Sequence, residues 1–205
     1  AVCPHLSAKN TDLAKATNEY RGATLCFIDP KPGANPLKTV LEGKWRRHAD
    51  NEEMACLMGA CYFLPREVFI RLELGRGFRA WGTWEPAASL AIWLAGYEIR
   101  LAGDVRIGHL FRDVSPYTIN TWEITLNKIW SIYTIIGDSD EAMTMLGKLK
   151  SVTNSGDWKR CMDEAVNRKA EIVSTRSRYA AMFTRDLPWY CDHFKIPLPD
   201  RKSVV

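Results

Sequence analysis

Hydrophobic and polar residues form distinct blocks along the first part of the chain, and these blocks predict short regular elements. Residues 24–28 are apolar or β-branched, which is typical of a strand, and the Pro- and Gly-containing run 29–33 is turn chemistry that ends it. Residues 34–53 are rich in charge, and we expect a loop-rich, mobile excursion there. The continuous apolar run 54–64 predicts a buried strand, in which Gly59 lets another group approach the backbone closely.

Two helices are predicted next, on either side of an aromatic loop. Pro65 suits a first helical position, so a short helix is expected over 66–74, where a glycine follows. Residues 78–84 contain aromatic residues and glycine and predict a loop. A second helix is expected from Glu85 to the glycine at position 96, because its apolar residues recur at helical spacing.

The rest of the chain is predicted to be mainly helical. Two short strands are expected at 97–101 and 105–110, and the pattern then changes to a helical period from Asn120. A long helix is expected over 155–184, and an extended tail after Pro188. Strands early and helices late indicate an α/β or α+β fold with a helical C-terminal extension.

The composition is that of an ordinary globular protein. In 205 residues, 46% are hydrophobic and 25% charged, values that exclude a disordered tail, a coiled coil or a collagen-like rod. Since no apolar run approaches about 18 residues, no membrane span is predicted. The start lacks both the basic and the apolar segment of a secretory signal, and it lacks a Met, which indicates a chain that begins partway through something longer.

Charge and cysteine content narrow the picture only slightly. The net charge of +4 tolerates an anionic ligand but does not argue for nucleic acid. Six cysteines without a C-x-x-C pair are expected to be free thiols in a reducing compartment, which predicts a cytoplasmic location. The predicted helix 155–184 mixes both signs of charge, so we expect a solvated face, with a surface for an acidic polymer as the alternative.

Four short motifs between residues 54 and 118 occur in an order that suggests a function. They are Met-Gly-Ala-Cys-Tyr-Phe at 58–63, Trp-Gly-Thr-Trp-Glu at 81–85 with Trp93 downstream, Ile-Gly-His-Leu-Phe-Arg at 107–112 and Pro-Tyr-Thr at 116–118. This segment resembles the catalytic half of a GT-A glycosyltransferase, and most closely the polypeptide N-acetylgalactosaminyltransferases. The resemblance is looser over 1–53 and ends before residue 135.

The resemblance implies roles for the residues that match the family motifs. His109 matches the histidine that ligates a divalent metal, Mn²⁺ or Mg²⁺, on the nucleotide diphosphate, and imidazole is a suitable ligand. Arg112 and Tyr117 match a loop that closes over the nucleotide, where an arginine stabilises the leaving diphosphate.

The resemblance also implies which residues face the donor sugar. Gly59, Ala60 and Cys61 match the stretch that faces the donor sugar, although Ala60 and Cys61 replace a second glycine of the family and put the identity of the sugar in doubt.

Glu85 lies four residues after Trp81, where inverting GT-A enzymes place their base, whereas the retaining family places its acid three residues after the tryptophan. Whether Glu85 is the base or a sugar-orienting acid stays open. A plain first-turn acid is the alternative. Trp81 and Trp84 are candidates for stacking on a sugar face, and core packing is the alternative for each.

One expected part is missing from the sequence. The family carries a D-x-D or D-x-H metal motif upstream of these residues, and none precedes residue 58. Asp138-Ser139-Asp140 follows His109 instead and is expected to be a loop or a helix N-cap. The chain could therefore be a fragment, one piece of a split enzyme with the nucleotide-binding half on another chain, or a relative that binds without catalysing.

The sequence thus predicts the second half of a GT-A domain, Rossmann-like with a mixed sheet, over 1–118 and a helical extension over 119–205. Its expected activity is metal-dependent transfer of a sugar from a UDP-sugar to an acceptor hydroxyl of a protein Ser or Thr, a glycan or a modified nucleobase. The alternatives are a non-catalytic subunit that binds a carbohydrate or nucleotide sugar, and a helical interaction domain with an accidental motif match.

Overall fold

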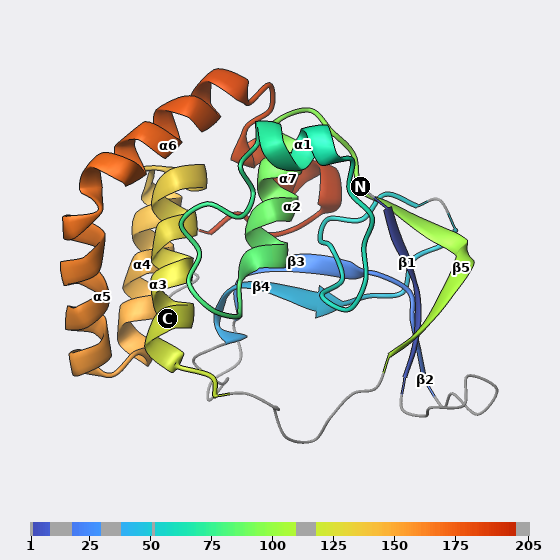
Figure 1. Ribbon diagram of the computed structural model, residues 1–205, viewed down its shortest axis with the longest axis horizontal. Coiled ribbons are helices and arrows are strands. Elements are labelled where there is room, and N and C mark those ends of the chain that lie inside the picture. The colour runs from blue at the N-terminus through green and yellow to red at the C-terminus, as the bar shows by residue number, and fades with distance from the viewer. Residues whose placement is uncertain (1, 9–17, 30–37, 51, 110–117, 200–205) are drawn as a thin grey trace.

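The chain has a mixed α/β architecture, seen in a computed structural model that describes residues 2–8, 18–29, 38–50, 52–109 and 118–199 (Figure 1). One sheet has the order β2-β1-β5, with β1 antiparallel to β2 and parallel to β5. A separate antiparallel pair is formed by β3 and β4. The strands are β1 (Val2–Ala8), β2 (Asn18–Tyr20), β3 (Ala23–Ile28), β4 (Val40–Trp45) and β5 (Arg100–His109).

Helices dominate the second half of the described chain, as predicted. A π-helix, Ile132–Ile136, continues α3. The α-helices are α1 (Arg66–Arg71), α2 (Trp84–Leu94), α3 (Thr121–Ser131), α4 (Asp140–Val152), α5 (Ser155–Asn167), α6 (Lys169–Met182) and α7 (Leu187–Phe194).

Strand β4 corrects the prediction of a loop-rich excursion over 34–53. It pairs with β3 in a register that sets Ala23 opposite Trp45 and Cys26 opposite Glu42. Val40 and Leu41 are buried, whereas the following residues are half-buried or exposed. Of the charged residues in the run 44–50 that indicated a loop, only Lys44 belongs to the strand, and residues 46–50 follow it without helix or strand, as expected.

The run 54–64 is buried at its start but does not form the predicted strand. A single bridge joins Cys56 to Ala23, and another joins Glu53, just before the run, to Arg100. Side chains bind its backbone instead: the Trp93 indole N–H donates to the Met54 carbonyl at 2.9 Å, and the Tyr190 hydroxyl donates to the Ala55 carbonyl at 2.7 Å. The Leu57 N–H donates to Ser89 Oγ at 2.8 Å. Buried backbone groups need partners, and side chains supply them here without a regular ladder.

Three further expectations are corrected. The two strands expected over 97–110 are one strand, β5, with a register shift opposite Pro4 and His5. The long helix over 155–184 is two helices that meet at Arg168. The first part of the tail after Pro188 belongs to helix α7, because the Asp186 side chain accepts the Trp189 N–H at 2.8 Å and proline is tolerated in a first helical turn. Residues 196–199 form neither helix nor strand.

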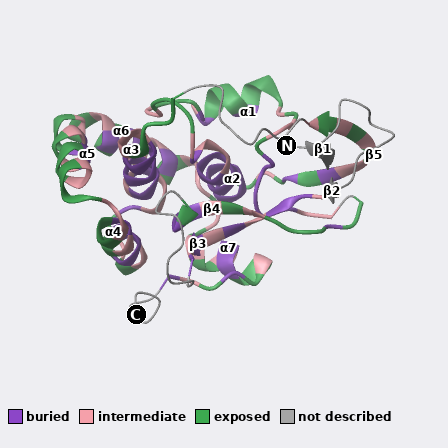
Figure 2. Cartoon of the chain, turned by 90° about the horizontal axis from the view of Figure 1, so that it is seen from below, coloured by how far each residue is buried: buried purple, intermediate pink, exposed green. Residues whose placement is uncertain are grey.

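Helix α2 packs on β4 near the middle of the molecule, and α3 to α6 lie together on one side (Figure 1). Buried residues surround α2, whereas α1 and much of α5 are exposed (Figure 2). The hydrophobic core includes Leu25, Trp93, Ile129 and Tyr190. It therefore contains residues from both predicted segments, 1–118 and 119–205. In the part of the chain that the structure describes, no helix is long and apolar enough to cross a membrane.

Candidate functional site

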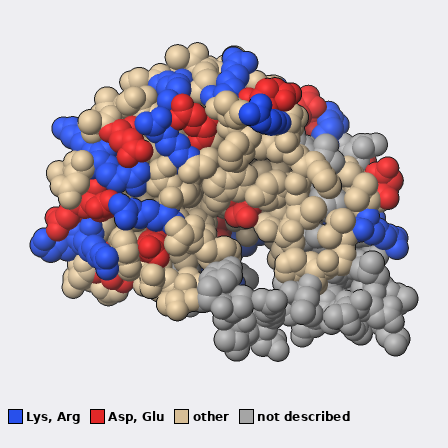
Figure 3. All heavy atoms as spheres, in the orientation of Figure 1, with Lys and Arg blue, Asp and Glu red and all other residues tan. Residues whose placement is uncertain are grey.

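A cavity of about 410 Å³ lies between β4 and the loop that precedes α2. Three predicted site residues, Gly59, Trp81 and Glu85, contribute to its lining, together with Glu42 and Trp45 from β4. Its volume is in the range of small-molecule sites, and its lining combines apolar side chains with a few polar groups. Figure 3 shows acidic atoms at the edge of a hollow in the middle of an otherwise largely uncharged area.

Glu85 lies in the first turn of α2 and its carboxylate contacts the glycine of the first motif. A β-carbon on Gly59 would lie 3.2 Å from Glu85 Oε1, so a larger residue here would require the Glu85 side chain to shift by a few tenths of an ångström. Burial raises the pKa of Glu85, and the negative charge of Glu42 raises it further. A raised pKa in a cavity is typical of a carboxyl group that exchanges protons with a ligand.

Trp81 is carried by a loop with unusual backbone geometry. Its neighbours Ala80, Gly82 and Thr83 have φ angles of 47°, 111° and 68°, a region that non-glycine residues rarely adopt. The buried side chain of Asn127 on α3 holds this loop. It accepts the Arg79 N–H at 2.8 Å and donates to the carbonyls of Arg79 and Gly82, at 2.7 and 3.1 Å. Strained backbone that is held in this way is common at binding sites.

The opposite wall of the cavity is held by the next residue of α3. Lys128 is 1% exposed, and its ammonium group donates to the Val40 carbonyl and to the Glu42 carboxylate. Burial lowers the pKa of Lys128, and the charge of Glu42 opposes that shift. An unpaired charge there would be costly, so the pair fixes Glu42 at the cavity wall.

Sequence reasoning missed Glu42, Trp45 and Lys128. The available signal was a lysine inside the apolar stripe of a predicted helix, since a charged residue at such a position needs a buried partner. That partner is 86 residues away in the sequence, and no local pattern identifies it.

The other predicted site residues lie outside this cavity. Ala60 and Cys61 are half-buried and pack against the core. The Trp84 indole N–H donates to the Leu74 carbonyl at 2.7 Å, and its ring stacks on Tyr62 with centroids 5.2 Å apart. His109 ends β5, opposite Ala8 of β1. Arg112 and Tyr117 fall outside the described residues.

A metal site is not complete among the described residues. Within them, no group of three or more His, Cys, Asp or Glu side chains is placed to hold an ion, so His109 is the one predicted ligand there. Asp138-Ser139-Asp140 has the structural role that was predicted: Ser139 Oγ caps α4 by accepting the Ala142 N–H at 3.3 Å, and Asp138 pairs with Arg176.

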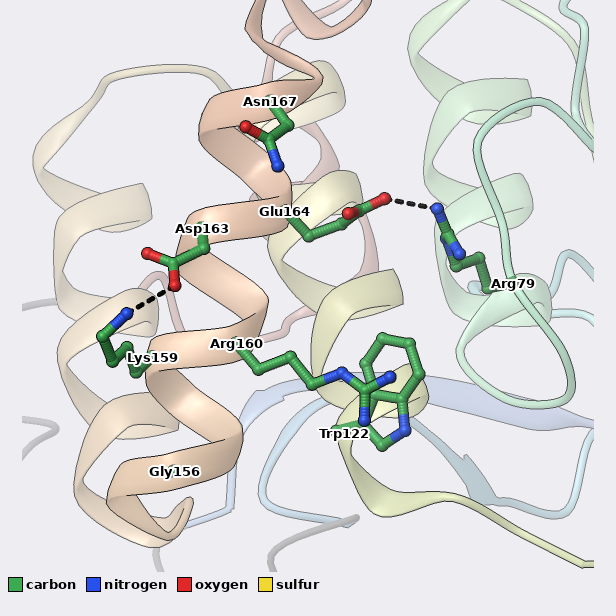
Figure 4. Close-up of a pocket in the computed structure, with 8 residues that line it drawn as sticks. All are labelled: Arg79, Trp122, Gly156, Lys159, Arg160, Asp163, Glu164 and Asn167. Atoms are coloured by element: carbon green, nitrogen blue, oxygen red, sulfur yellow. Dashed lines mark hydrogen bonds and ion pairs between the residues drawn. The ribbon is translucent and has the colours of Figure 1, made fainter.

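A second hollow lies between α3, α5 and the loop at Arg79 (Figure 4). Its charges pair with one another: Lys159 binds Asp163 at 2.6 Å, and Arg79 binds Glu164. Figure 4 shows the Arg160 guanidinium over the Trp122 ring, 3.5 Å from its centroid. Mixed charges of this kind are typical of the solvated face predicted for this helix.

The sequence matches none of the known protein-family models with which it was compared. The five described cysteines, Cys26, Cys56, Cys61, Cys161 and Cys191, are free thiols, as predicted.

Proposed function

We propose that the chain serves in glycosyl transfer, moving a sugar from a UDP-sugar to an acceptor hydroxyl with Glu85 as the base. One observation carries the proposal: the half-buried carboxyl group of Glu85 lies in a cavity of ligand size, against Gly59 and beside Trp81. These three residues come from two motifs that resemble the GT-A family. Gly59 belongs to the first motif, and Glu85, 26 residues later, belongs to the second. Their juxtaposition supports the resemblance.

In the proposed step, the Glu85 carboxylate takes the proton of the acceptor hydroxyl. At the same time the acceptor oxygen bonds to the anomeric carbon of the sugar. The bond from that carbon to the diphosphate breaks, and UDP leaves with the electron pair. Because burial raises the pKa of Glu85, it is a stronger base than an exposed glutamate. A single displacement inverts the anomeric carbon; a retained configuration would assign Glu85 to orienting the sugar instead.

The resemblance assigns the diphosphate to Arg112, Tyr117 and a divalent ion on His109. Mn²⁺ or Mg²⁺ would neutralise phosphate charge there. The proton transfer proposed for Glu85 uses only this carboxylate and the two substrates.

The test is the release of UDP from a panel of UDP-sugars, with Mn²⁺ and with neutral glycans or Ser/Thr peptides as acceptors. Glu85→Gln keeps the size of the side chain and removes the base, so the rate should fall by about 10²- to 10⁴-fold. Glu67→Gln is the matched control, because Glu67 is an exposed first-turn glutamate of α1. The control should keep the full rate.

A loss in both variants, or in neither, would contradict the role of Glu85. If the unmodified chain binds a UDP-sugar or saccharide but releases no UDP, and His109→Ala leaves that affinity unchanged, the chain is a binding subunit rather than a catalyst. If it binds neither, the motif match is accidental.

A further inference from the structure

Two tryptophans from separate segments border the same cavity. Trp45 at the end of β4 is 45% exposed, and Trp81 in the loop before α2 is 57% exposed. Both line the cavity that contains Glu85. Exposed apolar side chains that gather at one cavity, rather than being scattered singly, are typical of a binding surface.

Both indoles are carried by backbone that other residues hold in place. Trp45 is in register with Ala23 in the β3–β4 pair. The Trp81 loop is fastened by the three hydrogen bonds of Asn127. Binding surfaces that are ordered before the ligand arrives lose less entropy on binding. These two tryptophans are therefore suited to be fixed apolar plates.

The polar part of the cavity wall is mainly acidic. Glu42 and Glu85 contribute two carboxyl groups, and the exposed Lys38 contributes one ammonium group. The Lys128 ammonium holds Glu42 from behind. Ionised carboxylates accept hydrogen bonds and donate none, so they favour a ligand with many hydroxyl groups over an anionic one.

We propose that this cavity binds a neutral saccharide as the acceptor, with pyranose rings on Trp45 and Trp81 and ring hydroxyls on Glu42. A pyranose combines the two chemistries that the cavity offers: C–H faces that pack on aromatic rings and hydroxyls that donate to carboxylates. The acceptor role rests on the proposed function, whereas saccharide binding itself does not.

The test is a titration of the full chain with three neutral disaccharides, cellobiose, maltose and chitobiose, and with a Ser/Thr peptide, followed by saturation-transfer NMR. Trp45→Ala and Trp81→Ala should each weaken disaccharide binding about tenfold, and Trp45→Phe, which keeps a ring, should retain most of it. Phe63→Ala is the matched control, because Phe63 is 58% exposed and lies outside the cavity lining. It should leave the affinity unchanged.

Two results would overturn the proposal: binding of the peptide and of none of the disaccharides, or disaccharide binding that neither alanine substitution weakens. The release of UDP from UDP-sugars separates the two proposals. Turnover with the peptide alone overturns the saccharide acceptor and leaves the transferase. Tryptophan-dependent disaccharide binding without any turnover overturns the acceptor role and leaves a saccharide-binding module.

Discussion

Glu85 titrates differently in the folded and in the unfolded chain. Unfolded glutamate has a pKa of about 4.3, and burial raises the pKa of Glu85 in the fold. Between the two values the folded state holds more protons, so this group stabilises the fold at acidic pH, and that contribution is lost as the pH rises through the folded pKa. The ionised Glu85 carboxylate therefore costs stability at neutral pH.

Glu85→Gln should remove this dependence. Relative to the unmodified chain, the variant should become more stable as the pH rises from 4 to 8, measured as the difference in Tm by circular dichroism. Glu67→Gln should show no such trend, because that side chain is exposed. A difference in Tm that stays constant with pH for Glu85→Gln would show that the carboxyl group is not held in a desolvating site.

The charge of Glu42 should influence the pH at which Glu85 acts as a base. If the ionised Glu85 is the base, the transfer rate should rise with pH through the raised pKa of Glu85, so the acidic limb should lie above about 4.3. Glu42→Gln removes a negative charge that raises this pKa. The acidic limb should then move to lower pH, as measured by the pH profile of UDP release. A limb that stays in place or moves upward would contradict the coupling of the two carboxyl groups.

Single residues were predictable where a motif carried them. Glu85 and Gly59 were identified as site residues from sequence, and the structure brings them together, although their contact depends on the backbone of 54–59. Trp84 was a candidate for the same reason as Trp81, yet its indole is bound to Leu74. Trp81 and Trp84 belong to the same sequence motif, but Trp81 lies in the loop and Trp84 begins α2, so the fold decides which one faces the cavity.

At the scale of elements, α3 positions both walls of the cavity. Asn127 holds the Trp81 loop and Lys128 holds β4, and the two residues are adjacent in the sequence. Any change in the position of α3 is therefore transmitted to both walls.

Asn127→Ala should lower the free energy of unfolding by about 2–4 kcal/mol, because the backbone groups of Arg79 and Gly82 lose their partner. Urea unfolding measures this change, and hydrogen exchange should show faster exchange over residues 79–83. Asn167→Ala, at an exposed position of α5, should change stability by less than about 0.5 kcal/mol. A similar small effect of Asn127→Ala would contradict its role as the support of the loop.

Elements with strong local signals were predicted, and those that depend on partners were not. Helices α2 and α3 have apolar residues at helical spacing. A glycine with positive φ also marks where each one ends: Gly96 follows α2, and Gly137 follows the π-helix that continues α3. Strand β4 was predicted to be part of a loop, whereas the run 54–64 was predicted to be a strand and is not one. Charges on the outer part of β4 hid its pairing with β3, whereas side chains of Trp93, Tyr190 and Ser89 replace the strand partners of the apolar run.

At the scale of the molecule, the core crosses the predicted boundary between residues 118 and 119. Tyr190 of α7 donates to Ala55, and Tyr179 of α6 donates to the Leu72 carbonyl at 2.9 Å. We therefore expect one cooperative unfolding transition, with the same midpoint by far-UV and by near-UV circular dichroism. Two separate transitions would show that 1–118 and 119–205 are independent units.

We propose above all that the cavity beside Glu85 holds an acceptor saccharide. A crystal structure of the chain with a bound neutral disaccharide tests it most directly. We predict a sugar ring on Trp45 or Trp81 and one hydroxyl within about 3.2 Å of the Glu85 carboxylate. A disaccharide bound elsewhere, or one in this cavity without a hydroxyl on Glu85, would contradict the claim.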